Sequence, residues 1–157
     1  MTTEHLKFHE KRRRALLWLL LAAILGWTGF ILTRSMKTAA ESSVESLQVL
    51  QRLQRLFPHL TVHTLRKLAH FSEFFLLGLP AALLYGLWKR PSVLWPMLGC
   101  ALIAAADETI QLFFDGRSGE VRDVALDCLG AACAVICVWL LLRRRPSAQD
   151  NKRTKSI

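Results

Sequence analysis

Four long apolar segments dominate this sequence and restrict the folds that it can adopt. They are about 18 to 23 residues long and cover residues 15–32, 68–88, 92–114 and 124–142. A helix needs about 20 apolar residues to cross the roughly 30 Å hydrocarbon layer of a bilayer. Four strands are too few to close a barrel and would leave unpaired backbone groups in lipid. The segments therefore predict an all-α, polytopic membrane protein with four transmembrane helices.

The first apolar segment follows the basic stretch KFHEKRRRA, so a cleaved signal peptide is the alternative to a membrane anchor. Its apolar run is longer than the roughly 7–15 residues of a signal-peptide core. No clean Ala-x-Ala cleavage site follows it, and Thr38-Ala39-Ala40 is a poor substitute. We therefore expect an uncleaved anchor.

The distribution of charge predicts the orientation of the chain. The formal net charge is +9, with 21 Lys and Arg residues. Four crossings place both termini on one side, and 13 of the 21 basic residues then lie on that side, within segments 7–14, 89–90 and 143–155. Such a bias is typical of cytoplasmic flanks. We expect cytoplasmic termini whose basic runs contact anionic membrane lipids, and no nucleic-acid partner.

The chain divides into a basic cytoplasmic N-terminus (1–14), a membrane domain (15–142) and a basic tail (143–157) that we expect to be disordered. The extracytoplasmic loop 33–67 contains ESSVESLQVLQRLQRLF, which has helical periodicity and is followed by Pro58. We expect a short amphipathic helix that lies in the outer interface or caps the bundle. This helix either faces a ligand or only covers exposed apolar surface.

Cysteines and small residues inside the apolar segments indicate helix packing. The four cysteines form no Cys-x-x-Cys pair, so neither a zinc site nor a disulfide framework is predicted, and we expect no metal and no cofactor. Glycine and alanine recur at small-xxx-small spacing, which allows close approach of helices in a membrane. The positions concerned are Cys100, Cys128, Cys133 and Cys137, and the pairs Gly78/Ala82 and Gly130/Ala134.

Polar residues gather in three stretches that this topology brings to the outer rim of the bundle. These stretches are LRKLAHFSEFF, DETIQ and RDVALD. A charged side chain at mid-bilayer costs at least about 2.5–3.5 kcal/mol on insertion scales, so we expect the group to point inward and to pair. The predicted functional cluster comprises Lys67, His70, Glu73, Asp107, Glu108, Gln111, Arg117, Asp123 and Asp127.

Helical spacing within these stretches strengthens the prediction. His70 and Glu73 lie three residues apart and share a helix face, and Asp107 and Gln111 lie four apart. In the loop between the last two apolar segments, glycines favour a tight reversal, which lets the Arg117 guanidinium reach a carboxylate. A network that only holds the helices together is the alternative to a binding or chemical role. Asp115 and Glu120 fit solvated loop charges.

The stretches RKLAHFSEFFLLGL and DETIQLFFDGRSGEVRDVALDCLGA resemble the VanZ-like family of bacterial membrane proteins. The family pattern is K-x-x-H-x-x-E-[YF], followed by a D-E-x-x-Q helix, a G-R loop and a D-V-x-x-N-x-x-G helix. The resemblance covers about residues 66–134. Asp127 stands where the family often has Asn, so this site gains a negative charge. The resemblance implies a compact helical bundle in a bacterial cytoplasmic membrane, and the founding member is associated with teicoplanin resistance.

The leading functional hypothesis is an outward-facing polar pocket that binds a cell-envelope ligand. The expected partners are membrane lipids, a lipid-linked cell-wall precursor or a glycopeptide antibiotic, and a homo-oligomer is compatible with the sequence. A membrane-embedded acid–base or metal-assisted enzyme acting on a lipid headgroup is the alternative, although Ser72 does not share a helix face with His70. A proton-coupled carrier is a third reading, because intramembrane acids mark proton paths.

Overall fold

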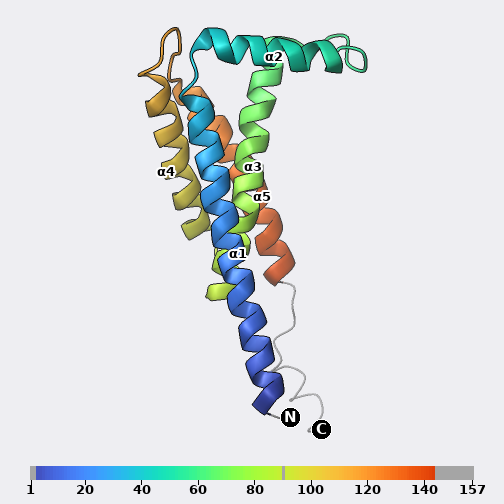
Figure 1. Ribbon diagram of the computed structural model, residues 1–157, viewed down its shortest axis with the longest axis vertical. Helices are drawn as coiled ribbons and strands as arrows, with labels where there is room; N and C mark the ends of the chain where they lie inside the picture. Colours follow the sequence, from blue (N-terminus) through green and yellow to red (C-terminus); the bar gives the residue numbers. More distant parts are fainter. Residues whose placement is uncertain (1–2, 90, 144–157) are drawn as a thin grey trace.

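The computed structural model describes residues 3–89 and 91–143, and within these residues every regular element is an α-helix. The prediction of an all-helical chain is confirmed for this part of the sequence. Four long helices form a bundle and one shorter helix lies across one end of it (Figure 1). The helices are α1 (Thr3–Ser35), α2 (Ala39–Leu53), α3 (Val62–Trp88), α4 (Leu94–Gln111) and α5 (Val121–Arg143).

The two ends of the bundle differ in structure. The helix α2 lies across the end at which α1 and α4 finish and α3 and α5 begin, and we call this the α2 end (Figure 1). The start of α1 and the finish of α5 lie toward the opposite end. There the Arg13 guanidinium donates a 2.7 Å hydrogen bond to the carbonyl oxygen of Leu87, which ties α1 to the end of α3.

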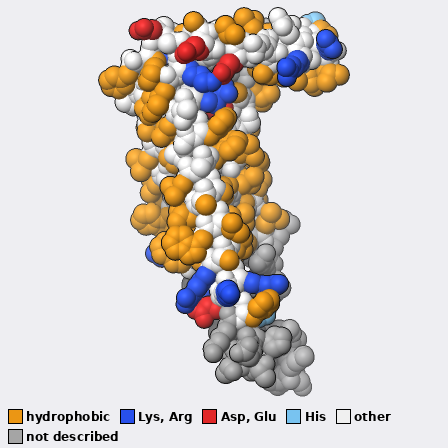
Figure 2. Space-filling view, in the orientation of Figure 1, with side chains coloured by type: hydrophobic (Ala, Val, Ile, Leu, Met, Phe, Trp, Pro, Cys, Tyr) orange, Lys and Arg blue, Asp and Glu red, His pale blue; other side chains and the backbone are white. Residues whose placement is uncertain are grey.

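Three of the described helices are long and apolar enough to cross a membrane: α1 from Phe8 onward, α3 and α5. Hydrophobic side chains cover the shaft of the bundle, and charged side chains gather beneath α2 and at the far end (Figure 2). The helix α4 is not among the three, because Asp107 and Glu108 near its end lower its mean hydropathy. The fourth span therefore stays a prediction.

Several helix boundaries differ from the predicted segments. The helix α3 begins at Val62, earlier than 68, because the Thr61 side chain accepts a hydrogen bond from the Thr64 N–H and caps a turn that contains the basic residues. The helix α1 also begins earlier than the predicted segment, at Thr3. The basic residues before the apolar segment continue the helix, because lysine and arginine have good helix propensity. Conversely, α2 ends at Leu53 and α4 at Gln111, each before apolar residues predicted to continue it. Residues 144–157 of the predicted tail lie outside the described residues.

The closest helix packing joins α3 to α5. A Cβ atom at Gly78 would lie 2.9 Å from the carbonyl oxygen of Ala131, and one at Gly130 would overlap the carbonyl oxygen of Phe71. Phe74 and Leu77 of α3 are fully buried in the adjoining core. The small residues therefore allow the backbones of α3 and α5 to approach, as their spacing predicted.

The loop between α4 and α5 is held against α2 and α4. Gly116 has a φ of +72°, a conformation that favours glycine. A Cβ atom at Gly119 would lie 2.6 Å from the carbonyl oxygen of Glu108, so a side chain there would separate the loop from α4. The Ala39 N–H donates a 3.0 Å hydrogen bond to the carbonyl oxygen of Asp115. These contacts position the start of α2, the loop and the end of α4 as one unit.

Candidate functional site: a polar cavity at the α2 end

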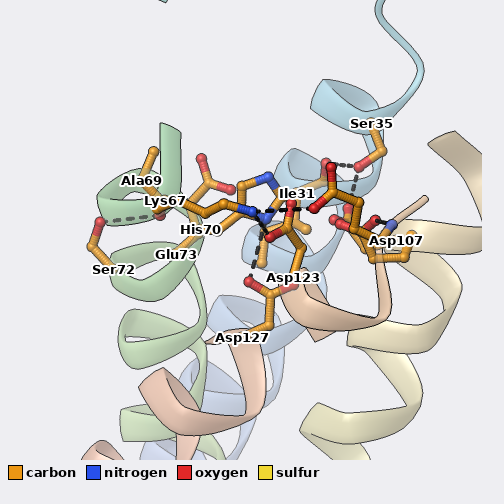
Figure 3. A network of polar contacts seen from close by, with 12 residues as sticks. Ile31, Ser35, Lys67, Ala69, His70, Ser72, Glu73, Asp107, Asp123 and Asp127 are labelled. Atoms are coloured by element: carbon orange, nitrogen blue, oxygen red, sulfur yellow. Dashed lines mark hydrogen bonds and ion pairs between the residues drawn. The ribbon is translucent and has the colours of Figure 1, made fainter. Parts of the chain in front are cut away.

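The structure brings the predicted polar residues together at the α2 end, on three helices and one loop. Figure 3 shows Lys67, His70 and Glu73 of α3 facing Asp107 of α4 and the carboxylates of α5. The residues on α4 are nearly enclosed, and Asp127 has no exposed surface. The whole predicted cluster lies in this region: Lys67, His70, Glu73, Asp107, Glu108, Gln111, Arg117, Asp123 and Asp127.

A cavity of about 200 Å³ opens between α1, α2, α3 and α4 at this end. Four of the predicted residues line it: His70, Glu73, Asp107 and Arg117. Much of the rest of its wall was not predicted from the sequence, and includes Arg34, Ser35, Ser42, Glu45 and Ser46. Arg66, from the stretch LRKLAHFSEFF that was expected at the outer rim, also lines the cavity.

Two of the three arginines that line this cavity form no ion pair among the described residues. Arg34 pairs with Glu73 at 3.3 Å and contacts Glu45 at 4.0 Å. Arg66 and Arg117 have no carboxylate oxygen within 4.0 Å in the described part of the chain. Burial lowers the pKa of the Arg117 guanidinium, and the nearby charge of Arg66 lowers it further. The predicted pairing of Arg117 with a carboxylate is not formed within 4.0 Å among the described residues, and Asp107 and Glu108 act on the Arg117 charge only from farther away.

Lys67 has a different environment from the arginines. Its ammonium group donates to Asp123 and lies 3.7 Å from Glu120. These residues line a smaller polar hollow of about 80 Å³, which also reaches Arg66 and Arg117. Because two carboxylates already neutralise Lys67, it is a weaker candidate for an anion contact than the arginines. Glu120, predicted as a solvated loop charge, is half-exposed but takes part in this pair.

An amide holds the two buried carboxylates of α4 side by side. The Gln111 side chain donates to Asp107 Oδ2 at 3.1 Å and to Glu108 Oε1 at 3.0 Å. The Ser35 hydroxyl donates to Asp107, and the Glu120 N–H donates to Glu108 Oε2 at 2.8 Å. Each carboxylate is thus oriented from both of its oxygens, and each keeps free lone pairs.

His70 and Asp127 face each other below these carboxylates. His70 Nδ1 lies 3.3 Å from Asp127 Oδ1, yet neither atom has a hydrogen-bond partner of good geometry within the described residues. Asp127 Oδ2 is also unpartnered there. The Ser72 hydroxyl points away and donates to the carbonyl oxygens of Leu68 and Ala69 (Figure 3). Ser72 and His70 therefore do not share a helix face, as their separation of two residues in the sequence predicted.

The residues that sequence reasoning missed come from α1 and α2. Arg34 is the second residue after the first apolar segment, and this position at the predicted membrane boundary was a signal that it lies at the rim. Ser42 and Ser46 lie one helical turn apart and, with Leu50, form the buried stripe of α2. The amphipathic helix predicted from ESSVESLQVLQRLQRLF is shorter than that stretch, because its last apolar residues Leu56 and Phe57 lie beyond α2 and are exposed.

A family model described as VanZ/LLP1 matches residues 18–142, which include the whole cavity wall. The chain belongs to the VanZ/LLP1 family. No curated protein matches it, and no solved structure does. As a VanZ/LLP1 protein with three helices able to span a bilayer, it is a membrane protein.

Proposed function

We propose that this chain is a multi-pass protein of a bacterial cytoplasmic membrane whose cavity faces outward and binds the anionic headgroup of a cell-envelope lipid. The observation that carries the proposal is the pair of guanidiniums, Arg66 and Arg117, that line the cavity without a carboxylate partner among the described residues. Arginine forks match the geometry of phosphate. The Ser42 hydroxyl on the α2 wall adds a donor, whereas the Ser46 hydroxyl already donates to the carbonyl oxygen of Ser42.

The path of the chain supports a fourth crossing by α4. The helix α3 finishes at the end far from α2, and α5 begins again at the α2 end (Figure 1). If α3 and α5 both span the bilayer, residues 89–120 must return across it, and α4 is the helix that does so. Its acidic residues lie near the α2 end and face the protein interior, where their cost in the bilayer is smallest.

The exposed side of α2 supports a position in the outer interface. Val44 and Leu47 are each about half exposed there, while Ser42 and Ser46 face the cavity. A helix of this kind rests its apolar side chains in the headgroup region. A lipid headgroup can then enter the cavity beneath α2 while its chains remain in the bilayer.

Lipid titration of the purified full-length chain tests the proposal. The probes are phosphatidylglycerol, undecaprenyl phosphate and inorganic phosphate, with phosphatidylcholine for comparison, and native mass spectrometry reports binding. Arg117→Gln and Arg66→Gln should each weaken binding of the anionic lipids about tenfold or more, because each removes a charge-assisted hydrogen bond. Arg55→Gln, an exposed change after α2, is the matched control.

The outcomes of this titration are distinct. Preference for the two anionic lipids over phosphatidylcholine, lost in the cavity variants and kept in Arg55→Gln, supports the proposal. Binding of inorganic phosphate alone identifies a free anion as the ligand and contradicts a lipid. Equal binding by wild type and both cavity variants contradicts the arginine site.

The proposal also includes altered glycopeptide susceptibility, which would follow from binding of a lipid-linked cell-wall precursor in the cavity. His70→Ala or Glu108→Ala should then abolish any change in teicoplanin susceptibility caused by expression of the chain, at unchanged membrane abundance. Loss of the phenotype only in step with loss of protein would favour a structural role for the cluster.

An acid–base enzyme acting on a lipid headgroup is the second candidate function. The observation that favours it is the His70–Asp127 pair, which lies beside the cavity and places an imidazole next to a buried carboxylate. Incubation with labelled lipids, followed by mass spectrometry of the products, tests this candidate. New products that disappear with His70→Gln would support it, and unchanged lipids would contradict it.

A further inference from the structure

Four potential metal ligands from three helices converge at the cavity wall, which two of them, His70 and Asp107, line. One donor atom each from His70, Asp107, Glu108 and Asp127 lies within 4.8 Å of the other three. The three carboxylates are nearly or fully buried, with exposed fractions of 2% for Asp107, 4% for Glu108 and 0% for Asp127. The fold therefore concentrates donors in a place that water reaches poorly.

Asp127 gives an independent indication of a ligand. It is completely buried and points toward His70 and the α4 carboxylates, yet neither of its oxygens has a hydrogen-bond partner within the described residues (Figure 3). His70 Nδ1 is also unpartnered there. A buried carboxylate whose only basic neighbour among the described residues is an imidazole at 3.3 Å in poor hydrogen-bond geometry is costly, and buried charges in proteins are paired or coordinate metals.

No described lysine or arginine lies within 4.0 Å of a carboxylate of this cluster, and Arg117 acts on Asp107 and Glu108 only from farther away. Lys67 pairs with Asp123 and Glu120, and Arg34 pairs with Glu73. Of the cluster carboxylates only Asp127 lies within 4.0 Å of a basic group among the described residues, and that group is the imidazole of His70. A divalent cation would offset the excess negative charge that remains.

We propose that His70, Asp107, Glu108 and Asp127 bind one divalent transition-metal cation. An imidazole beside carboxylates suits ions such as Zn²⁺ and Mn²⁺. Donors that share an ion at about 2.1 Å lie at most about 4.2 Å apart, so only small side-chain movements close the cluster. Gln111, Ser35 and the Glu120 N–H already orient the α4 carboxylates, as outer partners do in metal sites. This inference does not rest on anion binding by the arginines.

Metal analysis of the full-length chain tests the inference. The protein is purified in mild detergent without a metal-affinity tag, incubated separately with Zn²⁺, Mn²⁺ and Mg²⁺, dialysed and measured by elemental mass spectrometry. Wild type should retain about one Zn²⁺ or Mn²⁺ per chain. Asp127→Asn and His70→Gln should each lower affinity at least about tenfold. Glu73→Gln is the matched control, because this carboxylate lines the same cavity but lies outside the cluster of four.

Spectroscopy on the Mn²⁺ form separates loss of a ligand from loss of folding. Pulsed electron paramagnetic resonance should show coupling to an imidazole nitrogen that His70→Gln removes. Glu108→Gln, close in shape to the native residue, should also weaken retention while the protein stays monodisperse. Retention below a tenth of an ion per chain for both Zn²⁺ and Mn²⁺, or retention unchanged in Asp127→Asn and His70→Gln, would overturn the inference. Preference for Mg²⁺ without nitrogen coupling would overturn the assigned ligands.

Discussion

At the scale of single residues, the α2 end combines two kinds of polar group with different roles. Arg66 and Arg117 line an accessible cavity and lack carboxylate partners in the described chain, so they are suited to a ligand. Asp107 and Glu108 are buried and oriented by donors from α1 and from the loop after α4. The sequence predicted both groups from their positions. It did not predict which cations pair, because pairing depends on distances between helices.

Gln111 provides the most direct residue-scale prediction for stability. Gln111→Leu removes the amide that bridges Asp107 and Glu108, so one oxygen of each loses a buried donor. We expect the free energy of unfolding to fall by about 1–3 kcal/mol, measured as a lower thermal midpoint in detergent. Gln51→Leu, an exposed change on α2, should leave the midpoint nearly unchanged. Equal midpoints for Gln111→Leu and wild type would contradict the bridging role.

At the scale of helices, much of the fold follows from hydrophobic length and small-residue spacing. The apolar segments correctly indicate α1, α3, α4 and α5, and Gly78 and Gly130 mark the α3–α5 contact. Helix ends were less predictable, because side-chain caps such as Thr61 and the turn after Gln111 decide them. The stripe of Ser42 and Ser46 was not predicted, because serine has no hydrophobic signal.

Gly130 provides a prediction for helix packing. Gly130→Ala places a methyl group against the carbonyl oxygen of Phe71, so α3 and α5 must separate. We expect a loss of about 1–3 kcal/mol in the free energy of unfolding, measured by reversible unfolding in detergent. Gly99→Ala is the matched control, because a Cβ there has no atom within 4 Å. Equal effects of the two substitutions would contradict close α3–α5 packing.

The start of α2 provides a prediction for pH. The Thr38 N–H donates to the Glu41 carboxylate at 2.9 Å in a capping box, and this backbone hydrogen bond holds the Glu41 pKa below its usual 4.5. Because the folded pKa is lowered, the stabilisation is complete above the unfolded pKa and is lost as pH falls through the folded pKa. Hydrogen exchange of α2, corrected for intrinsic rates, should therefore accelerate in acid.

Glu41→Gln separates this effect from general acid unfolding. Glutamine keeps a hydrogen-bond acceptor at this position but does not titrate, so the acid-induced acceleration at the start of α2 should shrink. Exchange of α2 that responds to acid equally in both proteins would show that Glu41 does not control the cap.

At the scale of the whole molecule, an apolar shaft joins a basic end to a polar cavity beneath α2 (Figure 2). With the shaft across the bilayer, as proposed, the buried charges lie near one membrane face, where their cost is lower than at the bilayer centre. Segments distant in sequence meet there because α1 and α4 finish where α3 and α5 begin. The sequence predicted this meeting from alternating helix direction, but it could not show that α2 closes the cavity.

The number of membrane crossings can be tested by finding the side of the membrane on which each terminus lies. With α4 as a fourth span, reporters fused at either terminus should both be fluorescent in the cytoplasm, since an even number of crossings returns the chain to its starting side. A reporter that works only on the outer side of the membrane should be active when it is inserted in the loop that follows α2. Termini on opposite sides would show that α4 does not cross.

The most direct test of the account is an experimental structure of the full-length chain purified in native lipid. We expect headgroup density in the cavity, with phosphate oxygens about 3 Å from the guanidiniums of Arg66 and Arg117, and His70, Asp107, Glu108 and Asp127 grouped beneath it. A structure with these side chains at opposite ends of the bundle, or with lipid excluded from the cavity, would contradict the account.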